Sequence, residues 1–260
     1  MKKIFLFIAI LFFSSLASAG FLQMQEQIIM SKTTCTDCAS QSGAELYINF
    51  DHTTGDYEAC TSGDSTGTAS GAAASTTQNH TASACTASPL SSLYKTDTGQ
   101  YVRFDITSKD IFDSAHGYVD LWVYVGASAV NDTIFEAYFG ANDRFIIRLY
   151  GDTNHAYASH KNNEVNIEVA SANSSIDDSG WNHILVKFGD GADYDGSGAE
   201  LAINVNGDGW VYTATKNTLA AFATEPPDIE IGCATMCYAA AETDDVWIDD
   251  VKSYTTADGS

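Results

Sequence analysis

The stretch Tyr118–Val125, YVDLWVYV, decides the fold class, because polar or aromatic residues alternate in it with aliphatic ones without interruption. Side chains of a β-strand point in turn to the two faces of its sheet, so this alternation separates two faces. The aliphatic face carries Val119, Leu121, Val123 and Val125. The opposite face carries Tyr118, Asp120, Trp122 and Tyr124. The stretch therefore predicts a strand with one buried face and one aromatic, partly polar outer face.

The same alternation recurs along the chain, with clusters of turn residues between the runs. The runs with this pattern are 144–150, 164–169, 183–188 and 201–205. The sequence Asn206-Gly207-Asp208-Gly209 follows the last run and predicts a hairpin turn, because Asn and Gly tolerate positive φ. No helical pattern extends over more than a turn or two. Short strands at regular spacing with turns between them predict an all-β sandwich.

Composition excludes several classes of partner. The 260 residues include 12 Lys+Arg against 34 Asp+Glu, which gives a formal net charge of −22. Binding to phosphates requires a basic face, so nucleic acid is not expected as a partner, and anionic membrane surfaces are disfavoured for the same reason. The hydrophobic content of 45% is enough for a core, which argues against global disorder.

The first residues predict an export signal. Lys2 and Lys3 precede an apolar run from Ile4 to Phe13, and Ala17-Ser18-Ala19 has the pattern of a cleavage site. Residues 1–19 are therefore predicted to be a signal peptide that is cleaved, and the mature chain is expected to be secreted, extracellular or periplasmic. No later run is long and apolar enough to predict a membrane span.

Six cysteines follow the predicted signal peptide, at Cys35, Cys38, Cys60, Cys85, Cys233 and Cys237. An even number in an exported chain favours disulfides, and the sequence does not choose among the possible pairings. The alternative is a four-thiolate zinc site built from Cys35-x-x-Cys38 and Cys233-x-x-x-Cys237, although export favours oxidation.

Two parts follow the predicted signal peptide at residues 1–19. Residues 20–42 form an N-terminal segment that carries cysteines, and residues 43–260 form one domain without an internal linker. Within that domain, residues 61–92 consist almost entirely of Ser, Thr, Ala and Gly. A segment with so little apolar content is expected to be a surface insertion.

The order of the alternating runs resembles the laminin-G-like branch of the concanavalin A-like lectin and glucanase superfamily. The stretches that carry the resemblance are ELYINFD (45–51), GQYVRFD (99–105), GYVDLWVYV (117–125), GWNHILVKF (180–188), LAINVNG (201–207) and VWIDDVKSY (246–254). The resemblance implies a two-sheet antiparallel jelly-roll sandwich that binds glycans or cell-surface proteins, commonly with a structural calcium ion. It does not imply catalysis, because one fold hosts many functions.

The polar and aromatic faces of the predicted strands are candidate ligand-binding surfaces. Glycan recognition uses flat aromatic rings against apolar C–H patches, together with Asp, Asn and Arg side chains that bond hydroxyl groups. The candidate residues are Tyr118, Asp120, Trp122, Tyr124, Arg144, Arg148 and Asn166. The alternative is an ordinary half-solvated sheet whose aromatic cross-strand pairs stabilise it without binding anything.

The resemblance also implies a calcium site that joins the two ends of the domain. Asp51 ends the first strand of the pattern and Asp250 lies on the last one, beside Asp249. Hard cations take six to eight oxygen ligands in proteins, which clustered carboxylates supply. We therefore expect Asp51 and Asp250 to be calcium ligands.

A catalytic reading rests on Glu164-Val-Asn-Ile-Glu168. Glycosidases of this superfamily carry Glu-x-Asp-x-Glu on one strand, and here Asn166 replaces the Asp, which puts catalysis by Glu164 and Glu168 in doubt. The sequence thus favours a secreted non-catalytic domain that binds glycans or cell-surface ligands and is stabilised by calcium. The alternatives are a self-assembling structural protein of an extracellular filament or envelope, and a glycoside hydrolase.

Overall fold

Strands form where the sequence alternates. In the computed structural model, β7 spans His116–Val125 and β9 spans Asp143–Tyr150. The other predicted runs become β11 (Val165–Ala170), β12 (Trp181–Gly189) and β13 (Leu201–Val205). After β13, Asn206 and Gly207 have φ values of 54° and 80°, which confirms the predicted turn.

The structure describes residues 46–48, 50, 57–61, 65–80, 92–96, 99–106, 116–126, 131–140, 142–163, 165–189, 201–213, 226–233 and 245–254. All of them belong to one compact unit, Cys38–Ser260. The predicted signal peptide and the cysteine-bearing segment at 20–42 lie outside the described residues. No helix in the described part of the chain is long and apolar enough to cross a membrane.

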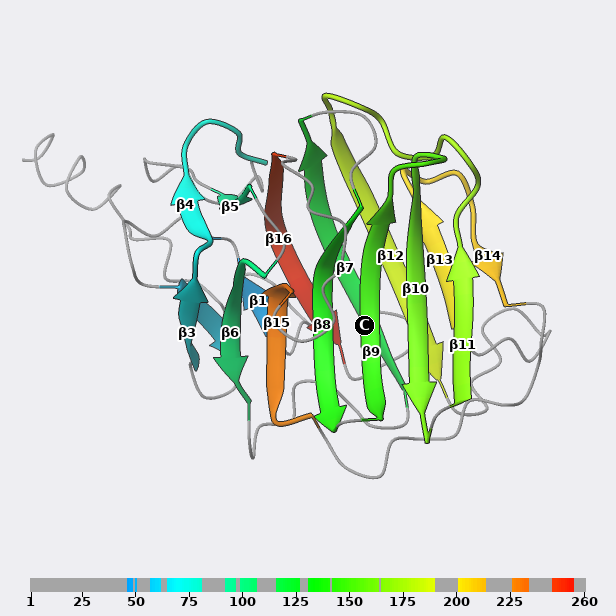
Figure 1. The fold of residues 1–260 in the computed structure, drawn as a ribbon, viewed down its shortest axis with the longest axis horizontal. Helices are drawn as coiled ribbons and strands as arrows, with labels where there is room; N and C mark the ends of the chain where they lie inside the picture. The colour runs from blue at the N-terminus through cyan, green and yellow to red at the C-terminus, as the bar shows by residue number, and fades with distance from the viewer. Residues whose placement is uncertain are drawn as a thin grey trace, which may run out of the picture. The chain divides into compact units, whose positions relative to one another are not determined.

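The strands form two antiparallel sheets that lie face to face (Figure 1). Sheet I has the order β2 (Tyr57–Thr61), β1 (Leu46–Ile48), β16 (Val246–Tyr254), β7, β12, β13 and β14 (Val211–Tyr212). Sheet II has the order β3 (Ser65–Ser70), β6 (Tyr101–Asp105), β15 (Asp228–Gly232), β8 (Asp132–Gly140), β9, β10 (His155–Asn162) and β11. Two short strands, β4 (Ala73–Ser75) and β5 (Ser92–Lys95), pair with each other and extend sheet I beside β16. The predicted all-β, two-sheet antiparallel sandwich is confirmed.

The core lies between the sheets and consists of the aliphatic and aromatic rows that the alternation predicts. Val119, Leu121 and Val123 of β7 are fully buried. Phe188 of sheet I contacts Phe145 of sheet II, with the ring centroids 4.9 Å apart. Burying one side chain of this size contributes about 1.5–3 kcal/mol, so these rows hold the two sheets together. The outer faces of the two sheets therefore point in opposite directions, and a single site cannot include residues of both.

The Ser/Thr/Ala-rich segment at 61–92 is more ordered than its composition predicts. Residues 65–70 and 73–75 form β3 and β4, and β3 pairs with β6. Gly67 is buried where a Cβ atom would lie 2.5 Å from Cγ1 of Val102, so only glycine fits there. Small residues let this backbone pair with the sheet edge without adding large side chains to the core, which the expectation of a surface insertion overlooked. Residues 81–91 of this segment lie outside the described residues.

A buried ion pair connects the two layers. Nζ of Lys95 on β5 donates to both carboxylate oxygens of Asp132 on β8, at 2.7 and 2.6 Å, and to the carbonyl oxygen of Thr133 at 3.2 Å. The side chain of Lys95 is 0% exposed and that of Asp132 is 10% exposed. A charge at this depth is stable only with its partner, because water cannot replace the lost contact.

A histidine also lies in the core. His160 of β10 is 2% exposed, pairs with Phe145 across the strand and has its ring 5.8 Å from that of Phe188. Burial lowers the pKa of His160 to about 3. The native protein therefore keeps His160 neutral in mildly acidic solution, where an unfolded chain would protonate it.

Removal of one member of the Lys95–Asp132 pair should destabilise the protein more than removal of both. We expect Lys95→Met or Asp132→Asn alone to lower the free energy of unfolding by ~3–5 kcal/mol, because each leaves a buried charge or carbonyl without its partner. The double variant Lys95→Met/Asp132→Leu should lose less than either single variant. Urea unfolding at pH 7 measures all three, and a loss below about 0.5 kcal/mol for both single variants would contradict the assigned role.

Replacement of His160 should flatten the dependence of stability on pH. Between the unfolded pKa near 6.5 and the folded pKa near 3, the unfolded state binds one more proton, so this group removes ~1.4 kcal/mol of stability per pH unit as the pH falls. We expect the stability of His160→Leu to fall less than that of the wild type between pH 8 and pH 4.5, by ~2–3 kcal/mol. Parallel profiles for the two proteins in urea unfolding would show that His160 is protonated in the native state.

Candidate functional site

The structure divides the predicted ligand-binding residues between two surfaces. Tyr118, Asp120, Trp122 and Tyr124 lie on the outer face of β7 in sheet I. Arg144 and Arg148 of β9 and Asn166 of β11 lie on the outer face of sheet II. These residues cannot form one site, since the two faces point away from each other. The alternation along each strand was predicted correctly, but it does not reveal which strands share a sheet.

On sheet I, Trp122 is stacked between two imidazole rings. His183 lies directly across from Trp122 on β12, with parallel rings whose centroids are 4.4 Å apart. His80 stacks on Trp122 at 3.8 Å and is bonded to aspartates of β16, the strand on the other side of β7. Both faces of the indole ring therefore contact protein. This arrangement does not support the prediction that Trp122 stacks on a sugar.

His80 is held in place by the two consecutive aspartates of β16. Its backbone N–H donates to Oδ2 of Asp249 at 3.0 Å, and its Nδ1 lies 2.8 Å from Oδ2 of Asp250. Asp250 is 2% exposed and has a φ of 49°, at an irregularity where β16 shifts its register on β7. The role of His80 was not predicted, because nothing distinguishes it within a segment rich in Ser, Thr and Ala.

These contacts bear on the predicted calcium site. The carboxylates of Asp249 and Asp250 accept hydrogen bonds from protein donors. Asp51, the other predicted ligand, lies outside the described residues. Among the residues that the structure describes, no group of three or more His, Cys, Asp or Glu side chains could hold a metal ion. Calcium binding by Asp51 and Asp250 stays a prediction.

The remaining aromatic rings of sheet I pack against each other. Tyr124 makes edge-to-face contacts with Trp181 at 5.7 Å and with Trp247 at 5.4 Å. Tyr118 makes an edge-to-face contact with Tyr254 at 5.7 Å, and burial raises the pKa of Tyr118 to about 12. Each such contact stabilises the sheet by about 0.5–1.5 kcal/mol beyond the buried area. Asp120, the polar member of this row, lies 2.8 Å from Nε2 of His183. The described part of this face therefore has the contacts of a structural aromatic network.

On sheet II, the outer face is hollowed into a groove. Its lining comes from adjacent strands, β9, β10 and β11, and consists of Arg148, Tyr150, His155, Tyr157, Glu168 and Ala170. The volume of this groove is about 340 Å³, near the lower end of the 300–1,000 Å³ range typical of small-ligand sites. The strand register explains why these residues meet, because Arg148, Tyr157 and Ala170 are direct cross-strand neighbours. We call this feature the sheet II groove.

Burial shifts the pKa values of three polar groups in the sheet II groove, and contacts with neighbouring groups also affect those of Tyr157 and Arg148. The pKa of Tyr157 is raised by burial and by a hydrogen bond from its hydroxyl to Glu168. Burial lowers the pKa of the Arg148 guanidinium and that of His155. The His155 ring stacks on Tyr150, with the centroids 5.4 Å apart. The groove thus combines two tyrosine hydroxyls, a cationic fork, a carboxylate and a neutral imidazole.

Glu168 and Asn166 occupy positions of the motif that resembles a glycosidase strand. Both are exposed on the edge strand β11, and Nδ2 of Asn166 donates to Oε1 of Glu168. Oδ1 of Asn166 accepts a hydrogen bond of 2.6 Å from the hydroxyl of Ser159. Glu164, the second carboxylate of the motif, lies outside the described residues. Glu168 is therefore positioned as a hydrogen-bonding group at the groove wall.

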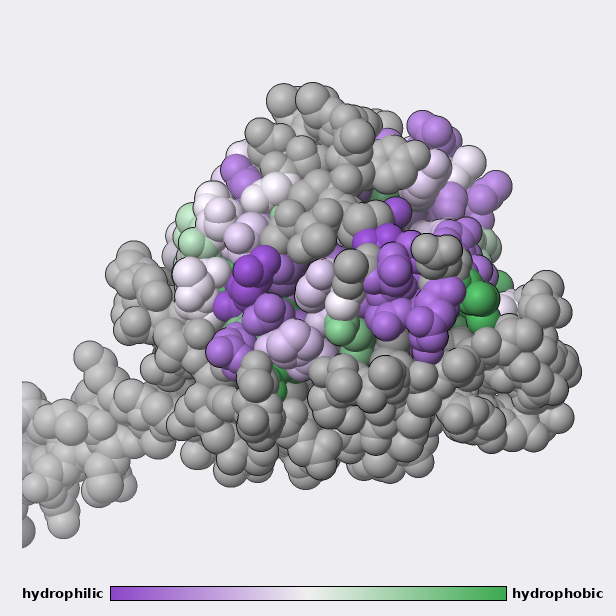
Figure 2. All heavy atoms as spheres, turned by 60° about the horizontal axis from the view of Figure 1, so that its bottom comes forward, coloured by the Kyte–Doolittle hydropathy of each residue, from purple (hydrophilic) through white to green (hydrophobic). Residues whose placement is uncertain are grey.

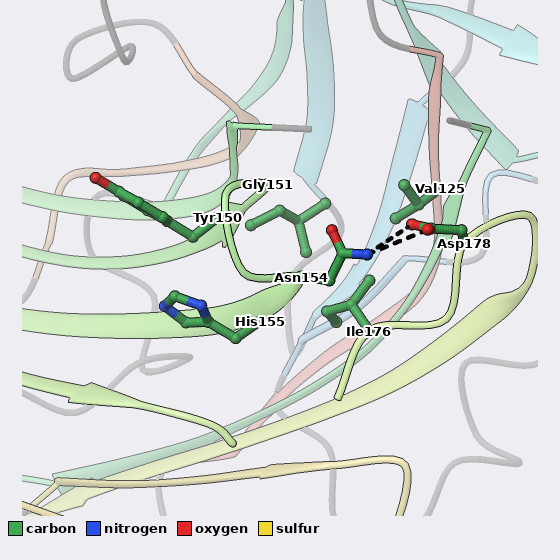
Figure 3. A pocket seen from close by; sticks show the side chains of 8 residues that line it. Val125, Tyr150, Gly151, Asn154, His155, Ile176 and Asp178 are labelled. Atoms are coloured by element: carbon green, nitrogen blue, oxygen red, sulfur yellow. Dashed lines mark hydrogen bonds between the residues drawn. The ribbon is translucent and has the colours of Figure 1, made fainter. Parts of the chain in front are cut away.

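Tyr150 and His155 also border a small cavity at the end of the sandwich (Figure 3). On its far side, Nδ2 of Asn154 donates to both carboxylate oxygens of Asp178, at 3.2 and 3.1 Å. The volume of this cavity is about 10 Å³, enough for one water molecule at most. It is too small for a ligand, so the sheet II groove is the larger candidate.

The surface of the described residues is strongly polar in the view of Figure 2, where hydrophilic residues dominate and hydrophobic ones are few. Among the described residues, the exposed large hydrophobic side chains are Val165 and Val211. Both lie on edge strands, β11 and β14. Recognition by a broad apolar surface is therefore not supported for the described part of the molecule.

Of the predicted disulfide cysteines, Cys233 is described in full, and it is disulfide-bonded. It is buried directly after β15. This bond argues against a thiolate role for Cys233 in the alternative zinc site. Disulfide formation by Cys35, Cys38, Cys60, Cys85 and Cys237 stays a prediction.

No protein-family model matches the sequence, and no curated protein matches it. Solved structures do match the fold. The binding domain of botulinum neurotoxin serotype D aligns with a TM-score of 0.61 at 10% identity, covering 84% of this chain and 49% of that one. A structure of botulinum neurotoxin type C, whose cell entry is dependent upon interaction with two ganglioside molecules, aligns with a TM-score of 0.59 at 10% identity over the same shares.

A mutant of Trypanosoma rangeli sialidase with trans-sialidase activity aligns with a TM-score of 0.56 at 10% identity, covering 84% of this chain and 31% of that one. This chain thus spans about half of the neurotoxin structures and less of the sialidase. At this identity the similarity establishes the fold and not the ligand or the activity. The finer resemblance to laminin-G-like domains stays a prediction. The chain has a two-sheet jelly-roll β-sandwich fold.

Proposed function

We propose that the chain is a secreted, non-catalytic carbohydrate-binding domain and that the sheet II groove is its binding site. The observation that carries the proposal is the groove itself, about 340 Å³ in volume, with Tyr150 and Tyr157 beside Arg148 and Glu168. Aromatic rings beside charged hydrogen-bonding groups suit a ligand with alternating C–H patches and hydroxyl groups, which describes a saccharide. The fold that this chain shares with glycan-associated proteins is consistent with this use but does not identify a ligand.

Each lining residue has a role in this proposal. Tyr150 and Tyr157 provide ring faces for the apolar side of a sugar ring. Arg148 donates to hydroxyl oxygens in a fixed planar geometry, and Glu168 accepts from hydroxyl groups. His155 is neutral near pH 7, because burial lowers its pKa, and can serve as either donor or acceptor.

Two further features favour binding over hydrolysis. The carboxylate of Glu168 is engaged by Asn166 and by the hydroxyl of Tyr157. A glycosidase needs a second carboxylate at a defined separation, and the middle position of the motif is Asn166 rather than Asp. We therefore favour binding without catalysis. Release of reducing sugar from a bound polysaccharide that disappears in Glu168→Gln would favour the hydrolase alternative instead.

We also propose that the chain is exported, that its cysteines form disulfides and that Asp51 and Asp250 hold a calcium ion, in a domain that resembles laminin-G-like domains. The alternative, a self-assembling structural protein, predicts a different oligomeric state in solution. A structural protein would form filaments or large assemblies regardless of glycan, whereas a binding domain would remain functional as a single copy.

Loss of the Tyr157 ring should weaken glycan binding. On a glycan array followed by calorimetry with the best ligand, we expect Tyr157→Ala to raise Kd at least about fivefold, equivalent to ~1 kcal/mol, as for a tyrosine at the centre of an interface. Tyr157→Phe should retain most of the affinity, because it keeps the ring. Tyr118→Ala is the matched control, since it removes a half-buried tyrosine from sheet I.

The opposite pattern, with affinity lost in Tyr118→Ala and kept in Tyr157→Ala, would place the site on sheet I and contradict the proposal. Melting temperatures of all three variants separate a lost contact from a lost fold. Failure of every glycan to bind the folded wild-type protein would also overturn the proposed function.

A further inference from the structure

Cationic side chains gather on the outer face of β9 and β10, which is unusual for a chain with a formal net charge of −22 and 12 Lys+Arg in total. Arg144 and Arg148 lie on the same face of β9, because their positions in the strand differ by an even number. Lys161 of β10 lies directly across from Arg144. Arg148 lines the sheet II groove, and the other two cations extend from it along the same face.

These neighbouring positive charges destabilise the folded sheet unless a negative charge lies close to them. Like charges directly opposite on neighbouring antiparallel strands repel each other, and Arg144 and Lys161 are such a pair. Neither of them has an ion-pair partner among the residues that the structure describes. By contrast, Lys95 and Arg103 are paired with Asp132 and Glu230.

The carboxylates on this part of sheet II offset the charge of the cations only in part. Glu136 of β8 is fully buried, and its charge raises the pKa of Arg148 against the larger lowering by burial. Glu168 is exposed, and its carboxylate is bonded to Asn166 and Tyr157. Among the described side chains that solvent reaches on the outer face of β9, β10 and β11, three cations, Arg144, Arg148 and Lys161, therefore stand against Glu168. With the buried Glu136 included, three cations lie near two carboxylates, and because charges farther away are screened over about 8 Å at physiological salt, this local excess favours an anionic ligand.

We propose that the sheet II groove and the adjoining cations bind an acidic saccharide, whose carboxylate or sulfate lies against Arg144, Arg148 and Lys161. This inference rests on the proposed function, since the tyrosines still hold the sugar ring. A guanidinium group matches the planar oxygens of a carboxylate or sulfate with two parallel hydrogen bonds, and Lys161 adds a point charge. An anionic ligand would also relieve the repulsion between Arg144 and Lys161.

The experiment compares polymers that differ only in charge. Polygalacturonate is matched by its fully methyl-esterified form, and dextran sulfate is matched by dextran. The full mature chain should bind at least one acidic polymer about tenfold more tightly than its neutral match at low salt, and this preference should shrink as salt is added. The polygalacturonate arm and the dextran sulfate arm distinguish a carboxylate ligand from a sulfate ligand.

Variants then test the residues. The double variant Arg144→Gln/Lys161→Gln should reduce the preference for the acidic polymer at least about fivefold, the effect of removing two favourable charge contacts. Lys252→Gln is the matched control, because it removes one cation from sheet I, where Lys252 lies 3.9 Å from Asp120. Its preference should match that of the wild type. Melting temperatures verify that each variant is folded.

The outcomes separate the two proposals. Binding of neutral glycans that depends on Tyr157, without any preference for acidic polymers, would overturn this inference and leave the proposed function standing. A preference for acidic polymers that survives in both the double variant and Arg148→Gln would overturn it as well. Failure of acidic and neutral glycans alike to bind would overturn both.

Discussion

The rest of this structure depends on one constraint. Side chains alternate between the two faces of each strand, and both sheets must bury their inner faces. Phe145 and Phe188 meet in the core from opposite sheets. Once these rows are buried, every residue one position away must point outward, and residues of different sheets must point to opposite sides. The outer faces of β7 and β9 are therefore distinct surfaces with distinct chemistry.

The two faces use aromatic residues differently. On sheet I, Trp122 lies between His80 and His183, and the contacts in this stack are made within the protein. On sheet II, Tyr150 stacks on His155 and, together with Tyr157, borders a groove that Arg148 and Glu168 also line. The proposed function therefore assigns ligand binding to the aromatic residues that border the groove and a structural role to those stacked within sheet I.

The sequence alone predicts where several strands lie but not which strands are neighbours in a sheet. Alternation located β7, β9, β11, β12 and β13, because one buried face leaves a strong local signal. It missed β10, whose inward positions include the small residues Ala156 and Ala158, and it therefore missed Tyr157 in the groove. Which strands are neighbours is set by pairings between distant parts of the chain, and local periodicity carries no information on these.

The Ser/Thr/Ala-rich segment at 61–92 also shows contacts that the sequence does not predict. Its composition predicts an exposed insertion, yet Gly67 packs in the core and His80 docks on Trp122. Glycine fits at Gly67 because the space beside Val102 excludes a side chain, and that space is a property of the folded sandwich. Close packing of this kind cannot be read from composition, which measures only how much apolar surface a segment brings.

The central claim is that ligand recognition takes place on sheet II and not on the aromatic face of sheet I. Backbone amide NMR shifts, followed while the tightest-binding glycan from the array is titrated into the labelled protein, test this claim most directly. The account predicts that the largest shifts fall between Arg148 and Ala170, around the groove. Shifts concentrated at 118–124 and 181–187 would contradict it, because those residues lie on the opposite side of the sandwich.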